Sequence, residues 1–303
     1  MKPALIIGST CVDIIIPVGR LPKTEENLHP QSQSMMLGGC AYNVAHIMRL
    51  FQAPHTLITP IGSGIYGDYV ASQFARLRIP ASIRVPDLEN GCCYCLVEAG
   101  GERTFLSIHG AEYTFQKAWM DSYPAQNYRF AYVCGLEIEE STGVALIEYL
   151  EEHPCLEVCY APGPRGVKIS SEKKERMFGI RPLLHINKQE ALDLSGCSDY
   201  EAAAERLHAR TQNTVIITLG AQGAYCKEKS GEAFLIPSVP SGHVADTIGA
   251  GDAHIGTILA LLTKGYPLRE AISCANIMSA AVVEHPGATL PAGHMPETLK
   301  KYL

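Results

Sequence analysis

Short apolar runs alternate with longer amphipathic stretches along most of the chain. The short runs hold four to six apolar and β-branched residues, which is typical of buried strands. In the longer stretches apolar positions recur every three or four residues, which predicts helices with one buried face. The pattern predicts strands at residues 4–7, 56–61, 130–134, 156–160, 183–186 and 215–219, and helices at residues 41–51, 68–77, 142–152, 199–210, 253–262 and 268–284.

Alternation of strands and helices predicts an α/β fold, with a central, mostly parallel sheet that helices cover on both faces. In such folds, ligands bind beyond the carboxyl ends of the strands. Gly8, Gly135, Asn187 and Gly220 all follow predicted strands, and a glycine-rich string stands at 246–252. We therefore expect the functional site at that edge of the sheet.

Two stretches near the N-terminus interrupt this alternation. Residues 13–36 contain three prolines, and residues 91–110 are typical of a hairpin, with strands at 93–97 and 104–106 around a turn at 100–102. Together these insertions predict a small β-sheet lid. Such a lid can close over a site and exclude water, whereas the alternative is a surface hairpin without a functional role.

Composition narrows the class of protein. The 303 residues suit a single α/β domain over residues 1–303, and the 47% hydrophobic and 18% charged content is that of a soluble globular protein. The net charge is −6, from 25 basic and 31 acidic residues, and no dense basic cluster occurs. This balance argues against nucleic acid or an anionic membrane as the main partner.

The remaining global features predict a cytoplasmic protein. No apolar stretch is long enough to span a bilayer, and the first eight residues are typical of a buried strand and not of a signal peptide. The eleven cysteines are an odd number. In this setting we expect reduced thiols that serve as small core residues.

The most informative motif is the string D-T-I-G-A-G-D at 246–252, followed by an apolar helical run. Gly249, Ala250 and Gly251 allow successive backbone N–H groups to turn toward an anion, and the start of a helix adds its dipole. Asp252 would then lie beside bound phosphate, where it could take a proton from a hydroxyl that attacks phosphorus. The alternative is an aspartate that merely favours a helix N-terminus.

A second glycine pair, Gly38-Gly39, precedes a predicted helix that carries Asn43 in its first turn. Glycines at a helix start allow close backbone approach, and Asn43 can hydrogen-bond sugar hydroxyls. Asp13, after the first strand, is a further acceptor for such hydroxyls. The alternative for both polar residues is a cap or a turn.

Asn187 and Glu190 follow the strand predicted at 183–186. Residues three apart share one face of a helical turn, and both side chains offer oxygen ligands that suit hydrated Mg²⁺. The same N-x-x-E pattern also serves as a helix cap. The two interpretations remain open at this point.

Residues 62–67 match G-x-G-x-x-G, and Asp87 lies twenty residues beyond Gly67, which is the spacing of a dinucleotide-binding fingerprint. However, Asp87 follows a proline near the expected lid and does not end the next strand of a βαβ unit. A nicotinamide enzyme is therefore disfavoured. The chain also lacks a G-x-x-x-x-G-K-[ST] motif, so any ATP binding is not of the P-loop type.

Taken in order, the motifs resemble the signature of the ribokinase-like (PfkB) carbohydrate kinases. The resemblance rests on Gly-Gly followed by Asn at 38–43, N-x-x-E at 187–190, T-x-G-x-x-G at 218–223 and the string at 246–252. It implies a ribokinase-like three-layer fold with a small β-sheet lid, and ATP and Mg²⁺ as cofactors. It also implies a monovalent cation such as K⁺ near the Asp246 loop and a homodimer formed through the lid.

The resemblance further implies a role for each motif residue. The carried-over roles are a general base at Asp252 with backbone donors at Gly249, Ala250 and Gly251; sugar contacts at Asp13, Gly39, Asn43 and Glu137; nucleotide contacts at Asn187, Thr218, Gly220, Gly223 and Asn276; and a metal contact at Glu190.

Two positions depart from the family pattern. After the strand at 156–160 the family often has an Asp-x-Asn-x-Arg run, whereas residues 161–165 keep only Arg165. His254 stands where a large apolar residue is usual, and it either touches substrate or is a hydrogen-bonded helix histidine. These departures leave the phosphate chemistry intact and the identity of the sugar open.

The expected function is ATP-dependent phosphorylation of the primary hydroxymethyl group of a ribose-, fructose- or nucleoside-like sugar. One alternative is a sugar-phosphate kinase, although the lid cations Arg20, Lys23 and Arg103 are offset by neighbouring glutamates. Another is a non-catalytic sugar-sensing protein. The presence of Asp252 and Glu190 argues against the sensor.

Overall fold

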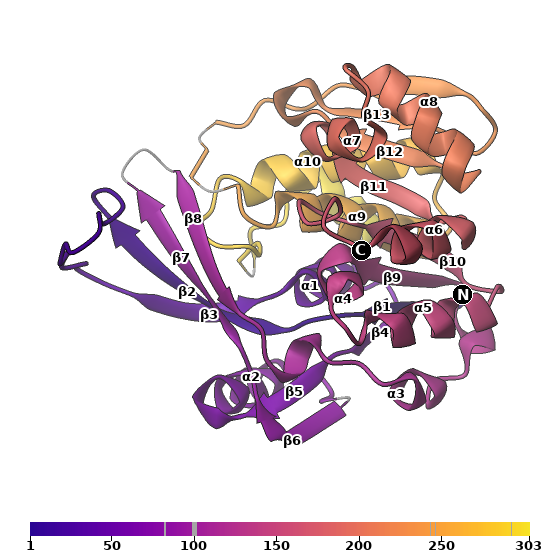
Figure 1. Ribbon diagram of the computed structural model, residues 1–303. Helices are drawn as coiled ribbons and strands as arrows, with labels where there is room; N and C mark the ends of the chain where they lie inside the picture. The colour runs from indigo at the N-terminus through magenta and orange to yellow at the C-terminus, as the bar shows by residue number, and fades with distance from the viewer. Residues whose placement is uncertain (82, 99–101, 243, 246, 292) are drawn as a thin grey trace.

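The computed structural model describes every residue except 82, 99–101, 243, 246 and 292. Its main element is an eight-stranded sheet in the order β14-β13-β12-β11-β10-β9-β1-β4 (Figure 1). The strands from β12 to β4 run parallel, and β13 and β14 add an antiparallel edge. The strands are β1 (Ala4–Ile7), β4 (His55–Ile58), β9 (Phe130–Cys134), β10 (Glu157–Ala161), β11 (Leu183–Asn187), β12 (Val215–Thr218), β13 (Ala224–Lys227) and β14 (Ala233–Ile236).

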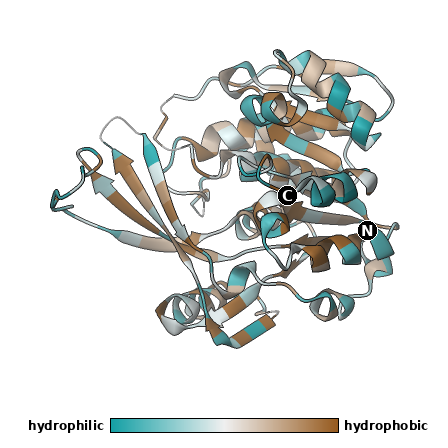
Figure 2. Cartoon of the chain, in the orientation of Figure 1, coloured by the Kyte–Doolittle hydropathy of each residue, from teal (hydrophilic) through white to brown (hydrophobic). Residues whose placement is uncertain are grey.

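Helices cover both faces of this sheet, as Figure 1 shows. Alternate residues of each strand enter opposite cores: Ile6 belongs to one hydrophobic cluster, and its neighbours Leu5 and Ile7 belong to the other. Burial on both faces explains why these strands are continuous apolar runs, brown in Figure 2. One face carries α1 (Cys40–Leu50), α2 (Gly64–Leu77), α9 (Ala250–Thr263) and α10 (Leu268–Val282); the other carries α3 (Lys117–Asp121), α5 (Gly143–Glu152), α6 (Ser171–Gly179), α7 (Lys188–Ser195) and α8 (Tyr200–Thr211).

A small second sheet projects from this α/β body (Figure 1). Its order is β3-β2-β7-β8, with β2 parallel to β7 and the other pairs antiparallel. The hairpin predicted from residues 91–110 is present, and its turn lies outside the described residues. The strands are β2 (Cys11–Val18), β3 (Ser34–Gly38), β7 (Cys92–Glu98) and β8 (Arg103–Ile108).

The predicted strand at 56–61 is wrong as a single element. The chain forms β4 and then β5 (Pro60–Ser63), which leaves the main sheet and pairs with β6 (Ile83–Glu89) in a two-stranded sheet. Proline has no backbone N–H to donate to a ladder and is tolerated as the first residue of a strand. Pro60 therefore marks the point where the chain changes sheet.

Other boundaries also differ from the prediction. Helix α2 begins at Gly64, so the G-x-G-x-x-G segment forms a strand end and the first turn of a helix. The short helices α6 and α7 and the β13–β14 edge were not predicted from the hydrophobic pattern, because they are short or largely polar. Within the described part of the chain, no helix is both long and apolar enough to cross a membrane.

Candidate active site

The glycine-rich turn before α9 has the conformation that an anion cradle needs. Gly249 is the N-cap of α9 with φ of 73°, and a Cβ at this position would lie 2.1 Å from the carbonyl oxygen of Ala288. Only glycine fits there without strain. At Gly251, no described residue outside the adjoining helix backbone has an atom within 4 Å of the corresponding Cβ position. Ala250 donates its N–H weakly to the Thr247 carbonyl at 3.4 Å, so this donor already has a partner within the turn.

Asp252 lies half-buried in the first turn of α9, where its Oδ2 accepts a hydrogen bond of 2.8 Å from Asn43 Nδ2. Burial raises the pKa of Asp252 to about 7, and the negative charges of Glu137 and Asp13 act in the same direction. The hydrogen bonds from Asn43 and Cys40 oppose this rise. A carboxylate with a pKa near the working pH suits general base chemistry.

The glycine pair before α1 makes room for two different neighbours. A Cβ on Gly38 would lie 2.1 Å from Oδ2 of Asp13, and one on Gly39 would lie 2.6 Å from the carbonyl oxygen of Ser9. Gly39 also has a φ of 97°, a left-handed conformation that favours glycine. The pair therefore lets Asp13 and the chain after β1 approach the start of α1, which carries Asn43.

Glu137 lies fully buried on the short helix α4 (Gly135–Glu139), which the hydrophobic pattern did not predict. Its Oε1 accepts a 2.8 Å hydrogen bond from the N–H of Ser9, and burial raises its pKa. Four buried polar atoms after β1, on α4 and on α1 have no hydrogen-bond partner among the residues that the structure describes. These atoms are Ser9 Oγ, Thr10 Oγ1, Asn43 Oδ1 and Glu137 Oε2.

Buried polar groups are normally paired, so unsatisfied ones indicate an incoming ligand or water. Ser9 and Thr10 were not singled out from the sequence. They follow β1 directly, so the rule that ligands bind at the carboxyl ends of parallel strands would have found them. Cys40 was likewise missed, and it lines a cavity together with Asp252.

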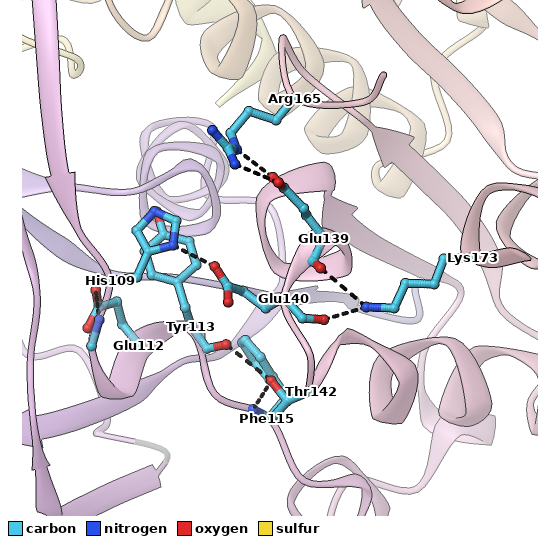
Figure 3. A network of polar contacts seen from close by, with 10 residues as sticks. His109, Glu112, Tyr113, Phe115, Glu139, Glu140, Thr142, Arg165 and Lys173 are labelled. Atoms are coloured by element: carbon cyan, nitrogen blue, oxygen red, sulfur yellow. Dashed lines mark hydrogen bonds and ion pairs between the residues drawn. The ribbon is translucent and has the colours of Figure 1, made fainter. Parts of the chain in front are cut away.

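A network of charged groups holds the segment that carries Glu137 (Figure 3). Lys173 on α6 donates to the carbonyl oxygens of Ile138 and Glu139 at 3.0 and 3.3 Å and also to that of Glu140. A cation at this position satisfies the last carbonyls of a short helix and complements its dipole. Lys173 thereby stabilises the end of α4.

An ion pair and a hydrogen bond extend this network (Figure 3). Arg165 donates to both carboxylate oxygens of Glu139, and His109 Nδ1 lies 2.6 Å from Oε1 of Glu140. Arg165 is the residue retained from the family's Asp-x-Asn-x-Arg run, and its partner Glu139 lies at the end of α4. His109 follows β8, so the second contact links the small sheet to the α/β body.

Asn187 and Glu190 form a capping box at the start of α7. Asn187 Oδ1 accepts from the N–H of Glu190 at 2.9 Å, and Glu190 Oε2 accepts from the N–H of Asn187 at the same distance. Glu190 Oε1 also accepts from Asn187 Nδ2 at 2.8 Å. Of the two interpretations of N-x-x-E, the structure shows the helix cap. Each carboxylate oxygen retains a further lone pair that can reach a hydrated metal ion.

Two cavities meet at the start of α9. One, of about 230 Å³, brings Asp252, Asn187 and Glu190 together with Cys40. The other is larger, about 590 Å³, and falls in the size range of small-molecule sites. Thr218 and Gly251 line both cavities. The larger one is also lined by Gly220, Gly223, Asn276 and His254.

A buried chain of side chains supports the wall of the larger cavity. Asn276 Nδ2 donates to the carbonyls of Ile236 and Pro237, so its Oδ1 accepts from His254 Nε2 at 3.1 Å. His254 Nδ1 then accepts from His185 Nε2 at 2.9 Å. Burial lowers the pKa of His254 to about 4, so this ring is neutral at pH 7. His254 is therefore a hydrogen-bonded helix histidine, and Asn276 uses its amide to hold the cavity wall.

The structure thus brings the predicted residues to one edge of the main sheet. Asn43, Asp252 and the capping box of α7 lie near the start of α9, and the residues after β12 line the adjoining cavity. The cation-binding loop expected at Asp246 lies outside the described residues.

Comparisons with known proteins agree with this arrangement. Residues 1–294 match the family described as pfkB family carbohydrate kinase. The chain is 30% identical to the uncharacterized sugar kinase YegV of Escherichia coli, over 94% of this chain and 90% of that protein. It is 28% identical to ribokinase of Staphylococcus aureus, over 94% of each chain.

Solved structures show the same fold. The structure of ribokinase from Thermotoga maritima superposes with a TM-score of 0.83 at 24% identity and covers 96% of this chain and 97% of its own. The nucleoside kinase of Burkholderia thailandensis in complex with inosine gives 0.75 at 22% identity and covers 94% of this chain and 92% of its own.

The chain therefore belongs to the PfkB family of carbohydrate kinases and has the ribokinase-like fold. It is a sugar or nucleoside kinase, a phosphotransferase with an alcohol group as acceptor. Kinases of this family use ATP and a divalent metal ion.

Proposed function

We propose that the chain phosphorylates the primary hydroxymethyl group of an unphosphorylated, polyhydroxylated sugar or nucleoside at the expense of ATP. The observation that carries this proposal is the group of buried polar atoms at Ser9, Thr10, Asn43 and Glu137 that have no hydrogen-bond partner within the described part of the chain. A ligand with several hydroxyl groups can both donate to and accept from such atoms. Asn43 and Glu137 lie close to Asp252, which supports an acceptor hydroxyl beside this carboxylate.

Asp252 acts as the general base in this proposal. Its carboxylate accepts the proton of the hydroxymethyl group as the oxygen attacks the γ-phosphorus of ATP. Asn43 donates its amide N–H to Oδ2 of Asp252 and so orients the carboxylate. The pKa of about 7 keeps a large fraction of Asp252 ionised at neutral pH.

The first turn of α9 holds the transferred phosphoryl group. Backbone N–H groups at Gly249 and Gly251 and the helix dipole stabilise charge that develops on the phosphoryl oxygens. The nucleotide occupies the larger cavity. Thr218 and Gly251 line both this cavity and the smaller one that contains Asp252. Mg²⁺, when bound, neutralises the charge of the polyphosphate.

Asn187 and Glu190 fit such a metal as outer ligands. Asn187 Oδ1 and Glu190 Oε1 accept hydrogen bonds within the capping box, which fixes the orientation of both side chains. Both residues line the cavity that contains Asp252. Hydrated Mg²⁺ usually keeps several of its waters. Glu190 would hold the ion by accepting hydrogen bonds from those waters.

The small sheet provides the lid that excludes water and prevents hydrolysis of ATP. Its charges favour a substrate without a phosphate group. Arg20 is paired with Glu26, with 2.6 Å between Nη1 and Oε2, and Arg103 Nη2 donates to the carbonyl of Ala245 at 3.4 Å. Two of the three lid cations thus already have partners, which disfavours a sugar-phosphate kinase.

The test measures ADP release from Mg-ATP with a panel of free sugars, nucleosides and sugar phosphates. Stimulation by one of the first two classes supports the proposal, and stimulation by sugar phosphates alone contradicts it. Sugar binding measured by calorimetry without any ADP release would favour the sugar-sensing alternative.

The Asp252→Asn variant tests the assigned base. It is expected to lower kcat about 10²- to 10⁴-fold, the usual contribution of a general base. Asparagine can still accept the hydrogen bond from Asn43, so binding of ATP and sugar is expected to persist. A loss of kcat within about tenfold would remove Asp252 from this role.

A further inference from the structure

Three potential metal ligands meet on one face of the small sheet. Asp13 on β2 and Cys93 on β7 are direct partners in the parallel pairing, and Cys95 lies two residues further along the same face. A carboxylate oxygen of Asp13 and the sulfur atoms of Cys93 and Cys95 all lie within 4.8 Å of one another. The thiols were expected to be core residues, but Cys93 is only half-buried.

The distances match a tetrahedral site for a thiophilic cation. With Zn–S bonds of about 2.3 Å and a tetrahedral angle, two sulfur ligands stand about 3.8 Å apart. The Sγ atoms of Cys93 and Cys95 are 3.8 Å apart. The two sulfur ligands therefore need little movement to bind such an ion.

Further polar groups surround these ligands. Ser107 Oγ donates to Cys93 Sγ at 3.3 Å from the neighbouring strand β8. The thiol of Cys11 donates to Asp13 Oδ1 at 3.7 Å, which places a third sulfur beside the group. Metal ligands are commonly held by such second contacts. The pairing of β2, β7 and β8 thus holds these side chains close together before an ion binds.

The choice of metal follows from the ligand atoms. Thiolates and a carboxylate select Zn²⁺ or Cd²⁺ over Mg²⁺, which requires oxygen ligands in octahedral geometry. Binding displaces the thiol protons, so two thiolates and one carboxylate would surround a divalent ion. A water molecule or Cys11 can complete four-coordination.

This face of the sheet is turned toward the α/β body. Arg103, on the same face of β8 as Ser107, donates to the Ala245 carbonyl, and Met36, the β3 partner of Asp13, packs against Gly287. The charge of Asp13 is also close enough to raise the pKa of Asp252. The ligand group therefore lies at the sugar side of the proposed active site.

We propose that Asp13, Cys93 and Cys95 form an inhibitory site for one thiophilic divalent cation of the Zn²⁺ type. An ion bound there engages the Asp13 carboxylate and makes it unavailable to sugar hydroxyls. Inhibition is then competitive with the sugar. This second part rests on the proposed function, whereas the binding site itself does not.

The binding test is a titration of the metal-free, reduced full-length protein with Cd²⁺, followed by the sulfur-to-cadmium charge-transfer absorbance. The expected result is one tight site per chain, weakened at least about tenfold in Cys93→Ser and in Cys95→Ser. Cys155→Ser is the matched control, because this thiol is exposed and lies elsewhere on the surface, and it is expected to bind as the wild type does.

Equal Cd²⁺ binding by the wild type and both serine variants would overturn the site, as would the absence of a tight site in the wild type. Circular dichroism and thermal unfolding check that each variant folds. Because Cys95 is buried and Cys93 is half-buried, Cys93→Ser decides the question if Cys95→Ser does not fold.

The kinetic test adds Zn²⁺ at a fixed excess of Mg-ATP and varies the sugar. The apparent KM for the sugar is expected to rise while kcat is unchanged, and Cys93→Ser is expected to lose this sensitivity. A fall in kcat alone would overturn competitive inhibition. If no sugar stimulates ADP release, the proposed function fails, but the Cd²⁺ titration still decides the site.

Discussion

At the scale of single residues, the environment of Asp252 decides what this carboxylate can do. Glu26 is an exposed carboxylate whose pKa is lowered by its hydrogen bond from Arg20, so it does not take up a proton near pH 7. Asp252 differs because it is withdrawn from solvent and close to Glu137 and Asp13. Its pKa of about 7 therefore depends on the segments that carry Glu137 and Asp13 as well as on α9 itself.

The pH dependence of the reaction follows from this pKa. Below pH 7 Asp252 is protonated and cannot act as a base, so kcat/KM is expected to rise with pH up to about 7 and then level off. Asn43→Ala removes a hydrogen bond that lowers this pKa, so the rising limb is expected to move to higher pH. Rates measured from pH 5.5 to 9 check both statements, and a profile without a rising limb would contradict them.

Stability should show the opposite trend. A carboxyl group whose folded pKa lies above its unfolded value favours the protonated form, so its ionisation destabilises the fold as pH rises from about 4 to 7. Asp252→Asn removes this ionisation, and its melting temperature at pH 8 is expected to equal or exceed that of the wild type. A clear decrease would mean that the ionised carboxylate stabilises the fold.

At the scale of elements, the start of α7 combines a structural and a proposed functional role in Glu190. Glutamine can complete a capping box, whereas alanine cannot. Glu190→Gln is therefore expected to keep the unfolding free energy but to require more Mg²⁺ for half-maximal activity. Glu190→Ala should also lose about 0.5–2 kcal/mol of stability. Denaturant unfolding and Mg²⁺ titration of the rate separate the two roles, and an unchanged Mg²⁺ requirement in Glu190→Gln would exclude the metal contact.

The turn before α9 allows a second test at this scale. Gly249→Ala forces a Cβ into the carbonyl of Ala288 at a positive φ, so a loss of more than about 1 kcal/mol of stability is expected. Gly251→Ala is the matched control, because its Cβ would meet no neighbour and alanine favours helix. Denaturant unfolding of the two variants is the measurement. Equal stabilities would show that the turn can rearrange.

At the scale of the whole molecule, the β8 edge of the small sheet carries exposed apolar side chains. Leu106 and Ile108 on β8 are 59% and 58% exposed, on the face opposite to Cys93. Contiguous exposed apolar side chains mark interaction sites more often than isolated ones. The homodimer through the lid that the family resemblance implies stays a prediction, and it would pair two small sheets through this face.

Leu106→Lys is expected to convert this dimer to a monomer, because it places a charge in the apolar interface. Light scattering after size-exclusion chromatography measures the mass. Leu235→Lys, at an exposed apolar position on β14 of the main sheet, is the control and should stay dimeric. A monomeric wild type would refute the proposed dimer.

The sequence by itself determined the parts of this protein that depend on local patterns. Apolar periodicity placed most strands and the long helices, since each buried face repeats with the period of its own element. The ordered glycine motifs identified the family and the edge of the sheet where the site lies. Where the periodicity is weak or mixed, elements were missed or predicted wrongly. An example is the strand predicted across Pro60, where the chain leaves the main sheet.

Only the tertiary structure decided how these local parts combine. Asn43 and Asp252 are 209 residues apart and share a hydrogen bond, and the partner of Arg165 is Glu139 on a helix that was not predicted. The pKa of Asp252 and the closeness of Asp13 to two thiols likewise depend on packing between distant segments. Burial and electrostatic interactions depend on distances in space. The sequence can therefore indicate which residues are involved, but it does not predict their charge state or their hydrogen-bond partners.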